Sequence, residues 1–215
     1  MTHYDDCRRA VLEAAQGLLA HGLTVGNSGN VSARVPDERR LLLAITPHAR
    51  YYDTMTAEDI VVVDEEGEPV VGEGIPSVEL GLHAAIYRLR PDVGAVIHAH
   101  PPMASAAAVV GRPIPPILED QVLCLGGQIE VAPPALTGSP ELAANAVRAL
   151  GEGNACLLAN HGALAVGRDP RAALCHCQYL EKLAQVFLFA TWAGSVNVLP
   201  PDMVEAATAF FRMRR

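Results

Sequence analysis

The stretch Val93-Gly94-Ala95-Val96-Ile97-His98-Ala99-His100 has the composition of a buried strand, and it ends in two histidines just before Pro101-Pro102. Side chains two positions apart in an extended strand point to the same face, so His98 and His100 can offer two imidazoles to one ion. A His-x-His pair is also common at solvated strand edges. The stretch therefore indicates a buried strand and leaves a metal site as one of two interpretations.

A third histidine occupies a similar position in the sequence. His161 lies in Asn160-His161-Gly162, directly after the apolar run 155–159. Three imidazoles with an open fourth position commonly hold a catalytic divalent ion. Because two separate apolar runs end in histidine, the sequence favours a metal site formed by His98, His100 and His161.

Composition restricts the class of protein. The chain has 215 residues, half of them apolar, which is enough for one substantial core and predicts a single domain over residues 1–215. The net charge is −8 and basic residues cluster only at 212–215, so a nucleic-acid partner is not expected. The chain lacks an apolar stretch of roughly 20 residues and has a polar, acidic start, so we expect no membrane association and a cytoplasmic location. Five cysteines without a Cys-x-x-Cys motif indicate free thiols.

Hydrophobic periodicity gives a coarse order of elements. It predicts helices over 5–20, 77–89, 104–110, 139–150 and 169–193, with a last amphipathic helix after Pro200. It predicts strands over 31–34, 41–45, 60–63, 93–98, 156–159 and 163–166. Helices interleaved with short strands and hairpins indicate a layered α/β domain with a mixed, mainly antiparallel central sheet.

Six short motifs follow one another along the chain. They are Gly26-Asn27-Ser28-Gly29-Asn30-Val31-Ser32-Ala33-Arg34, Ile45-Thr46-Pro47, Pro76-Ser77-Val78-Glu79 with His83, Arg90-Pro91-Asp92, Val96-Ile97-His98-Ala99-His100, and Asn160-His161-Gly162. Each is unspecific alone, but in this order and spacing they resemble the class II aldolase/adducin family over most of the chain. The resemblance implies a three-layer αβα fold and a ring-shaped homotetramer with active sites between subunits.

The resemblance also assigns roles to individual residues. His98, His100 and His161 match the metal-binding histidines of the family, and Glu79 matches a catalytic acid/base that also binds the ion when no substrate is present. From the residues alone, a glutamate in the first turn of a helix usually complements the helix dipole. His83, one helical turn later, is expected to pack or to support the site and not to be a fourth imidazole ligand. Zn²⁺ is the expected ion, with Mn²⁺ or Co²⁺ as alternatives, because imidazole and carboxylate accept all three.

The segments that bind phosphate in sugar-phosphate members of the family differ here. The first segment, which ends at Asn30, is intact, and the third keeps Ser77 but has Val78 where those members have a second serine. The second reads Thr46-Pro47-His48-Ala49-Arg50, where they have a small hydroxyl residue and a glycine. Valine gives a phosphate no donor, so we expect a substrate without a phosphate group to be preferred.

Five positions are therefore candidate substrate-binding residues. His48 and Arg50 could meet a planar carboxylate, or they are ordinary surface residues of a loop. Spacing from Gly126-Gly127 places Asp120 where the aldolases have a tyrosine that assists proton transfer. A carboxylate can act as a base, but it repels an anionic substrate unless the ion compensates. The full set is Asn30, His48, Arg50, Ser77 and Asp120.

The leading functional hypothesis is a metal-dependent lyase of the fuculose-phosphate aldolase type acting on a small carbonyl or carboxylate compound. It would cleave a carbon–carbon bond next to a carbonyl through a metal-stabilised enediolate, with Glu79 moving the proton. A decarboxylase of a hydroxy-carboxylate is the runner-up, and an epimerase is a weaker option. A non-catalytic, adducin-like interaction module is the alternative from another class. The intact histidines and Glu79 argue against it.

Overall fold

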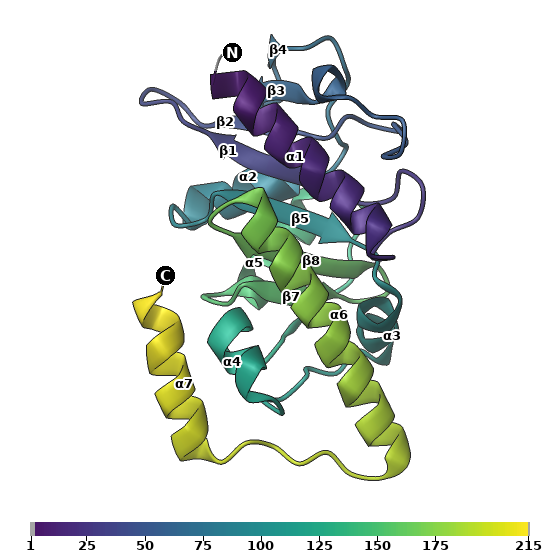
Figure 1. Ribbon diagram of the computed structural model, residues 1–215, viewed down its shortest axis with the longest axis vertical. Coiled ribbons are helices and arrows are strands. Elements are labelled where there is room, and N and C mark those ends of the chain that lie inside the picture. Colours follow the sequence, from purple (N-terminus) through teal and green to yellow (C-terminus); the bar gives the residue numbers. More distant parts are fainter. Residues whose placement is uncertain (1–2, 215) are drawn as a thin grey trace.

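One mixed sheet runs through the middle of the protein in the computed structural model, which describes residues 3–214 (Figure 1). Its neighbouring strands are antiparallel, except for the parallel pair at one edge formed by β6 and β7. This confirms the predicted mixed, mainly antiparallel sheet. In spatial order the strands are β4 (Pro69–Val71), β3 (Val61–Asp64), β2 (Leu42–Ile45), β1 (Asn30–Val35), β5 (Ala95–Ala99), β8 (Gly162–Gly167), β7 (Ala155–Leu158) and β6 (Val131–Ala132).

Helices cover both faces of the sheet and give the expected three layers. On one face, α1 (His3–Ala20) and the first half of α6 (Pro170–Ala193) share an apolar cluster with β1 and β5. On the other face, α2 (Leu80–Leu89) and α5 (Pro140–Leu150) share a second cluster with β2, β5 and β8. Figure 1 shows α1 and α6 in front of the sheet and α2 and α5 behind it. The remaining helices are η1 (Ala57–Asp59), α3 (Pro102–Val110), α4 (Glu119–Leu125) and α7 (Pro201–Met213).

Strand alternation decides which layer each side chain of β5 enters. Ala95 and Ile97 pack into the cluster with α1 and α6, whereas Val96 packs into the cluster with α2 and α5. His98 has the same parity as Val96, so it lies on the α2 side of the sheet. Asn30 is its direct cross-strand partner on β1. The side chains of His98 and Asn30 therefore both lie on the face of the sheet that α2 covers, near the N-terminal end of that helix.

The predicted boundaries needed corrections. The helix expected from Ser77 begins only at Leu80, because the segment before it pairs with the chain after β2. Pro76 forms a β-bridge with Pro47, and the backbone N–H of Ser77 donates to the carbonyl of Thr46 at 3.3 Å. Two helices begin earlier than predicted, at His3 and Pro102, and the short elements β4, α4 and β6 were not predicted.

Three residues, Met1, Thr2 and Arg215, lie outside the described residues. The polar start and the basic end seen in the sequence are therefore only partly covered, and the single domain over 1–215 stays a prediction. Among residues 3–214, no helix combines the length and apolar character needed to cross a membrane. All five cysteines are free thiols, as expected from their number and spacing.

Candidate metal centre

His98 lies in β5 on the side of the sheet that α2 covers, and its side chain is fully buried. Its Nδ1 lies 3.0 Å from the carbonyl oxygen of Ala163 on the neighbouring strand β8. A carbonyl only accepts, so a neutral His98 carries its proton on Nδ1 and keeps the lone pair of Nε2 free. The strand pairing thus selects the tautomer that a metal-ligating imidazole needs.

His100 follows the last residue of β5, and two contacts hold it. Glu181 of α6 accepts hydrogen bonds from two backbone N–H groups in the first turn of α3, which fixes the chain after His100. Oγ of Ser28 lies 2.6 Å from Nδ1 of His100 and can accept its proton. The remaining nitrogen, Nε2, lies 3.0 Å from Nε2 of His98. Two imidazole nitrogens this close are placed to share one cation.

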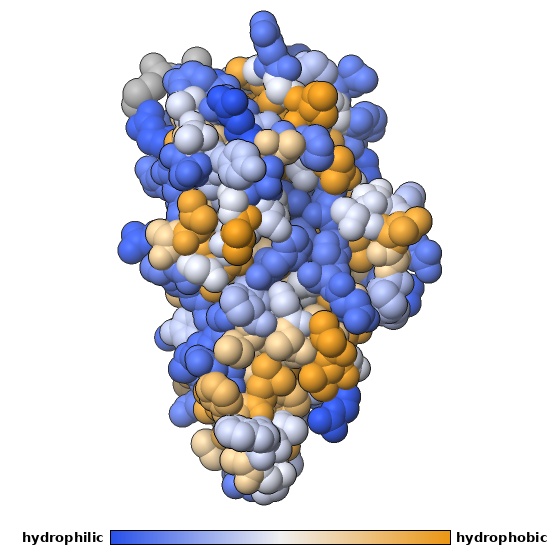
Figure 2. All heavy atoms as spheres, turned by 90° about the vertical axis from the view of Figure 1, so that its right-hand side faces the viewer, coloured by the Kyte–Doolittle hydropathy of each residue, from blue (hydrophilic) through white to orange (hydrophobic). Residues whose placement is uncertain are grey.

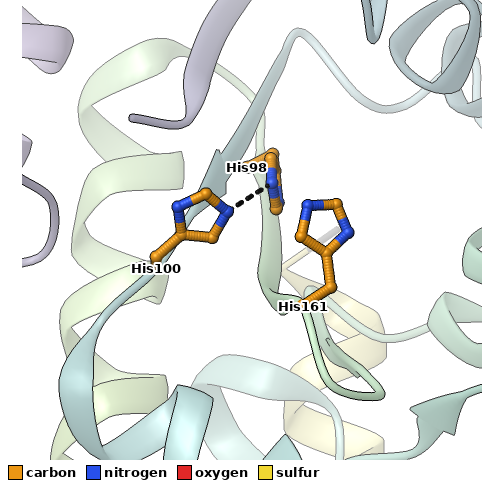
Figure 3. A group of neighbouring side chains, drawn as sticks. All are labelled: His98, His100 and His161. Atoms are coloured by element: carbon orange, nitrogen blue, oxygen red, sulfur yellow. Dashed lines mark hydrogen bonds between the residues drawn. The ribbon is translucent and has the colours of Figure 1, made fainter. Parts of the chain in front are cut away.

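His161 reaches the same place from the tight turn between β7 and β8. Asn160 adopts a φ of 56° in this turn, a left-handed conformation that asparagine tolerates. The ring centroid of His161 lies 4.6 Å from that of His98 and 5.4 Å from that of His100. One candidate ligand atom from each of the three residues lies within 4.8 Å of the other two. Figure 3 shows the three rings converging from two separate segments.

Glycine at position 162 permits this convergence. A Cβ atom at Gly162 would lie 2.5 Å from Cδ2 of His100 and 2.6 Å from the carbonyl oxygen of Ala99. Both distances are shorter than a nonbonded carbon contact allows, so any side chain here would displace the His100 ring or the end of β5. The glycine of the Asn-His-Gly motif therefore serves the packing of the histidine cluster.

Glu79 faces the cluster from the position directly before α2 and is almost fully buried. Its Oε2 lies 3.3 Å from Nε2 of His98, and its Oε1 lies 3.8 Å from Nε2 of His161. Oε1 is buried and has no hydrogen-bond partner among the described residues. An unpaired buried carboxylate oxygen costs free energy, which a cation among the three Nε2 atoms would offset. This orphaned oxygen is a sign, independent of the histidines, that a cation fits here.

Burial keeps two histidines of the cluster, His98 and His100, neutral. Desolvation, followed by the nearby His161, lowers the pKa of His98 to about 3. Desolvation, followed by the neighbouring histidines, lowers the pKa of His100 to about 4. A neutral imidazole has the free lone pair that a metal ion requires, so the site is prepared for a cation near neutral pH.

Asn30 and Ser77, two of the predicted substrate-binding residues, lie against Glu79. Nδ2 of Asn30 donates to Oε2 of Glu79 at 2.8 Å, and Oγ of Ser77 accepts from the backbone N–H of Glu79 at 3.3 Å. Both side chains therefore help to hold Glu79 in place. Their contact with a substrate stays a prediction.

His48 and Arg50 lie in an exposed loop beside a different cavity, of about 360 Å³. Nη2 of Arg50 lies 3.0 Å from Oδ1 of Asp59, so its guanidinium already has a carboxylate partner. Neither Glu79 nor the histidine cluster lines this cavity. The structure therefore separates these two residues from the cluster, and their role as substrate ligands stays a prediction.

Asp120 lies in α4, and its Oδ2 lies 2.5 Å from Nζ of Lys182 on α6. In Figure 1, α4 lies to the left of α6, whereas the C-terminal end of β5 lies to its right. Asp120 is thus not brought to the histidine cluster of its own subunit. Its role as a substrate-binding residue stays a prediction.

Sequence reasoning missed several polar supports of the site. Ser28 and the buried Ser32 were recognised only as parts of a motif, and the buried Tyr87 was not considered. His83 was expected to support the site, and its Nε2 lies 2.5 Å from Oδ1 of Asn30, the residue that binds Glu79. The available signal was spacing, because Ser32 lies two positions after Asn30 on a strand and Tyr87 lies four after His83 on a helix.

Comparison with known proteins identifies the family. A family model, Class II Aldolase and Adducin N-terminal domain, matches residues 9–188. The chain belongs to this family. It is 35% identical over 205 residues to a 5-methylthioribulose-1-phosphate/5-deoxyribulose-1-phosphate aldolase of Rhodospirillum rubrum, covering 95% of this chain and 90% of the relative. It is 34% identical over 180 residues to an L-fuculose phosphate aldolase of Escherichia coli K12, covering 84% and 81% of the two chains.

The structural comparison agrees with this assignment. The fold matches a solved L-fuculose 1-phosphate aldolase with a TM-score of 0.90 and 33% identity, over 96% of both chains. The family and fold predicted from the motifs are confirmed. Class II aldolases use a divalent metal ion, and the three-histidine cluster of this member fits one.

Proposed function

We propose that this class II aldolase family member is a metal-dependent lyase that breaks a carbon–carbon bond next to a carbonyl group. The observation that carries the proposal is the buried Glu79, whose unpaired Oε1 faces the histidine cluster. A carboxylate with one oxygen held by Asn30 and the other unpaired is suited to proton transfer. A site with no catalytic role would have no reason to retain this costly arrangement.

The proposed ligands of the divalent ion are His98, His100 and His161, with Zn²⁺ as the expected ion and Mn²⁺ or Co²⁺ as alternatives. When bound, such an ion supplies a Lewis acid beside the substrate carbonyl. Glu79 would bind the ion in the absence of substrate and would transfer the proton at the reacting carbon when substrate is present. General acid–base catalysis of this kind typically contributes about 10²–10⁴-fold. Because Asn30 holds Oε2, Oε1 is the atom proposed to carry the proton.

For the substrate, we propose a hydroxy-carbonyl compound or a carboxylate without a phosphate group. Val78, next to Glu79, has 57% of its surface exposed and offers no donor to a phosphate. The exposed Arg50 is paired with Asp59, and His48 lines the same cavity as Arg50. This cavity is separate from the histidine cluster, so the two side chains give no phosphate donor next to Glu79 in this subunit.

A ketose 1-phosphate is the alternative substrate, and one observation favours it. Ala49 has a φ of 56°, the left-handed conformation that favours glycine, at a position where sugar-phosphate members have glycine. An alanine in this conformation costs about 1–2 kcal/mol of stability. The backbone at Ala49 therefore has the conformation expected of the family's glycine, although alanine disfavours it. The relatives named above are also phosphate-ester aldolases by name.

Two other functions remain as weaker proposals, one catalytic and one not. A decarboxylase of a hydroxy-carboxylate would use the same ion and the same carboxylate, with carbon dioxide leaving in place of an aldehyde. A non-catalytic, adducin-like module is disfavoured, because it would not need Glu79 buried with an unpaired oxygen. Metal binding in full stoichiometry without turnover of any carbonyl substrate would favour the module.

We also propose a homotetramer with active sites between subunits, in a cytoplasmic location. Figure 2 shows apolar side chains gathering on the lower part of one face. Trp192, near the end of α6, has 87% of its surface exposed, and Phe189 and Val109 are also exposed. Surfaces of this kind often mark contacts between proteins.

The test combines metal analysis with turnover. Elemental analysis should find one divalent ion per chain, and His100→Ala should remove most of it, whereas the matched control His21→Ala, at an exposed histidine, should not. Cleavage is then measured with ketose 1-phosphates, unphosphorylated hydroxy-ketones and hydroxy-carboxylates. Undiminished metal in His100→Ala would refute the site, and inactivity of the metal-loaded protein on all three classes would refute the lyase.

A further inference from the structure

A chain of buried polar side chains runs from Glu79 through the interface between β1 and α2. Asn30 and Ser32 come from the strand, and His83 and Tyr87 come from the helix. All four are buried, with His83 and Ser32 fully inaccessible. Tyr87 also belongs to the apolar cluster that α2 and β5 share. The interface therefore contains a continuous polar path where apolar packing would be expected.

Strand and helix periods place these four residues on facing sides. Asn30 and Ser32 are two positions apart, so they share one face of β1, and His83 and Tyr87 are four positions apart, so they share one face of α2. Nε2 of His83 lies 2.5 Å from Oδ1 of Asn30, and Nδ1 of His83 lies 2.6 Å from Oγ of Ser32. Oγ of Ser32 lies 2.8 Å from the hydroxyl oxygen of Tyr87. The imidazole thus bridges two residues of the strand.

The carboxylate at one end sets the direction of every hydrogen bond. Ionised Glu79 can only accept, so Asn30 donates from Nδ2 and turns Oδ1 toward His83. Oδ1 also only accepts, so His83 donates from Nε2 and its Nδ1 is left as an acceptor. Ser32 then donates to Nδ1 and accepts from the hydroxyl of Tyr87. Each of these four contacts then pairs a donor with an acceptor, and the hydrogen bonds all run in one direction.

Burial supports this assignment, because a charged imidazole would have to donate from both nitrogens. Desolvation, followed by the nearby His98, lowers the pKa of His83 to about 3. His83 is therefore neutral near pH 7 and carries one proton, which the neighbouring amide oxygen places on Nε2. The opposite orientation of Asn30 would turn its amide oxygen toward the carboxylate of Glu79, and that contact would be repulsive.

We propose that His83, Ser32 and Tyr87 are positioning residues that lock Asn30 so that it holds Oε2 of Glu79 and leaves Oε1 free for proton transfer. The proposal rests on the proton-transfer role of Glu79 given above. It adds that residues without a direct contact to the side chain of Glu79 determine how well Glu79 works. Stability alone would not require the path, because an apolar set of similar shape can replace a satisfied polar one at little cost.

Four variants test the proposal in the metal-loaded protein. His83→Leu removes the donor to Asn30, and we expect kcat to fall by about 10- to 100-fold with little change in KM. Tyr87→Phe removes only the far hydroxyl, so kcat should fall less. His83→Gln keeps an N–H that can reach Asn30 and should restore most of the activity. The matched control is Ile86→Val. Ile86 is a fully buried residue of α2 that takes no part in these hydrogen bonds, so the substitution should lower thermal stability and leave kcat unchanged.

A second readout does not depend on activity. Nitrogen-15 NMR of the metal-free protein, with His83→Gln used to assign the signals, reports which ring nitrogen carries the proton. We expect a neutral His83 protonated at Nε2. A proton on Nδ1, or wild-type kcat in folded His83→Leu, would overturn the proposal. If the wild-type protein cleaves none of the test substrates but His83 carries its proton on Nε2, the proposed lyase function is refuted. The assigned direction of the hydrogen bonds from Tyr87 to Glu79 is then still supported.

Discussion

Replacing Gly162 by alanine should disrupt the metal centre without removing any ligand. The new Cβ would lie 2.5 Å from Cδ2 of His100, and ordinary contacts begin near 3.4 Å, so the ring has to move by about 0.9 Å. The neighbouring carbonyl of Ala99, 2.6 Å from the same Cβ, belongs to the backbone and cannot rotate away. Metal–ligand distances tolerate only about 0.2 Å. We expect much weaker metal binding, a loss of kcat/KM of about 100-fold, and a loss of stability of about 1–3 kcal/mol.

The assay is metal titration of the chelator-treated protein, followed by thermal unfolding with and without Zn²⁺. The matched control is Gly81→Ala, an exposed position in α2 where a Cβ meets nothing within 4 Å. It should bind metal normally and be as stable as the wild type, or more stable by about 0.5–1 kcal/mol. If Gly162→Ala binds Zn²⁺ as tightly as Gly81→Ala does, the three histidines do not form the site in this geometry.

The remaining predictions concern Glu79, the substrate and pH. Glu79→Gln should keep the fold and abolish exchange of the substrate's reacting proton with deuterated solvent; wild-type exchange in this variant would refute the acid–base role. A carboxylated or unphosphorylated substrate should have a higher kcat/KM than the corresponding ketose 1-phosphate. The opposite order would refute the substrate proposal and indicate a phosphate-ester aldolase. Burial lowers the pKa of His83 from 6.5 in the unfolded chain to about 3 in the folded protein. Between pH 6.5 and pH 3, the unfolded chain therefore binds a proton at His83 that the folded protein does not bind. The free energy of unfolding of metal-free protein should therefore fall as pH drops below 6.5, by up to about 1.4 kcal/mol per pH unit from this group. Urea unfolding at pH 7 and pH 5 should show a smaller loss in His83→Gln.

The fold was predictable where periodicity was strong. The apolar run 93–98 and the hairpin around Asn160-His161-Gly162 became β5, β7 and β8, the central strands beside the site. The short elements β4, α4 and β6 gave no signal, because a few residues contain too little of either period. The start of α2 was misplaced, because the helical pattern continued back to Ser77 while a bridge between Pro47 and Pro76 held that segment extended.

The site was predictable as a set of residues and not as an arrangement. The motifs pointed to Glu79 and the three histidines, and the structure brings these four together. The other candidates separated into two groups. Asn30 and Ser77 hold Glu79, whereas Arg50 and Asp120 form ion pairs with Asp59 and Lys182. Spacing along the chain cannot report such pairs, because the partners are brought together only by folding.

The sequence alone determined the family, the layered α/β class and the identity of the candidate metal ligands, because these depend on local periodicity and on motif order. Only the tertiary structure decided which nitrogens of His98 and His100 face the centre, which oxygen of Glu79 has no hydrogen-bond partner and in which direction the hydrogen bonds through His83 run. These properties arise from hydrogen bonds between β5 and β8 and between β1 and α2. A proton is placed by the acceptor it meets, and that acceptor lies tens of residues away along the chain.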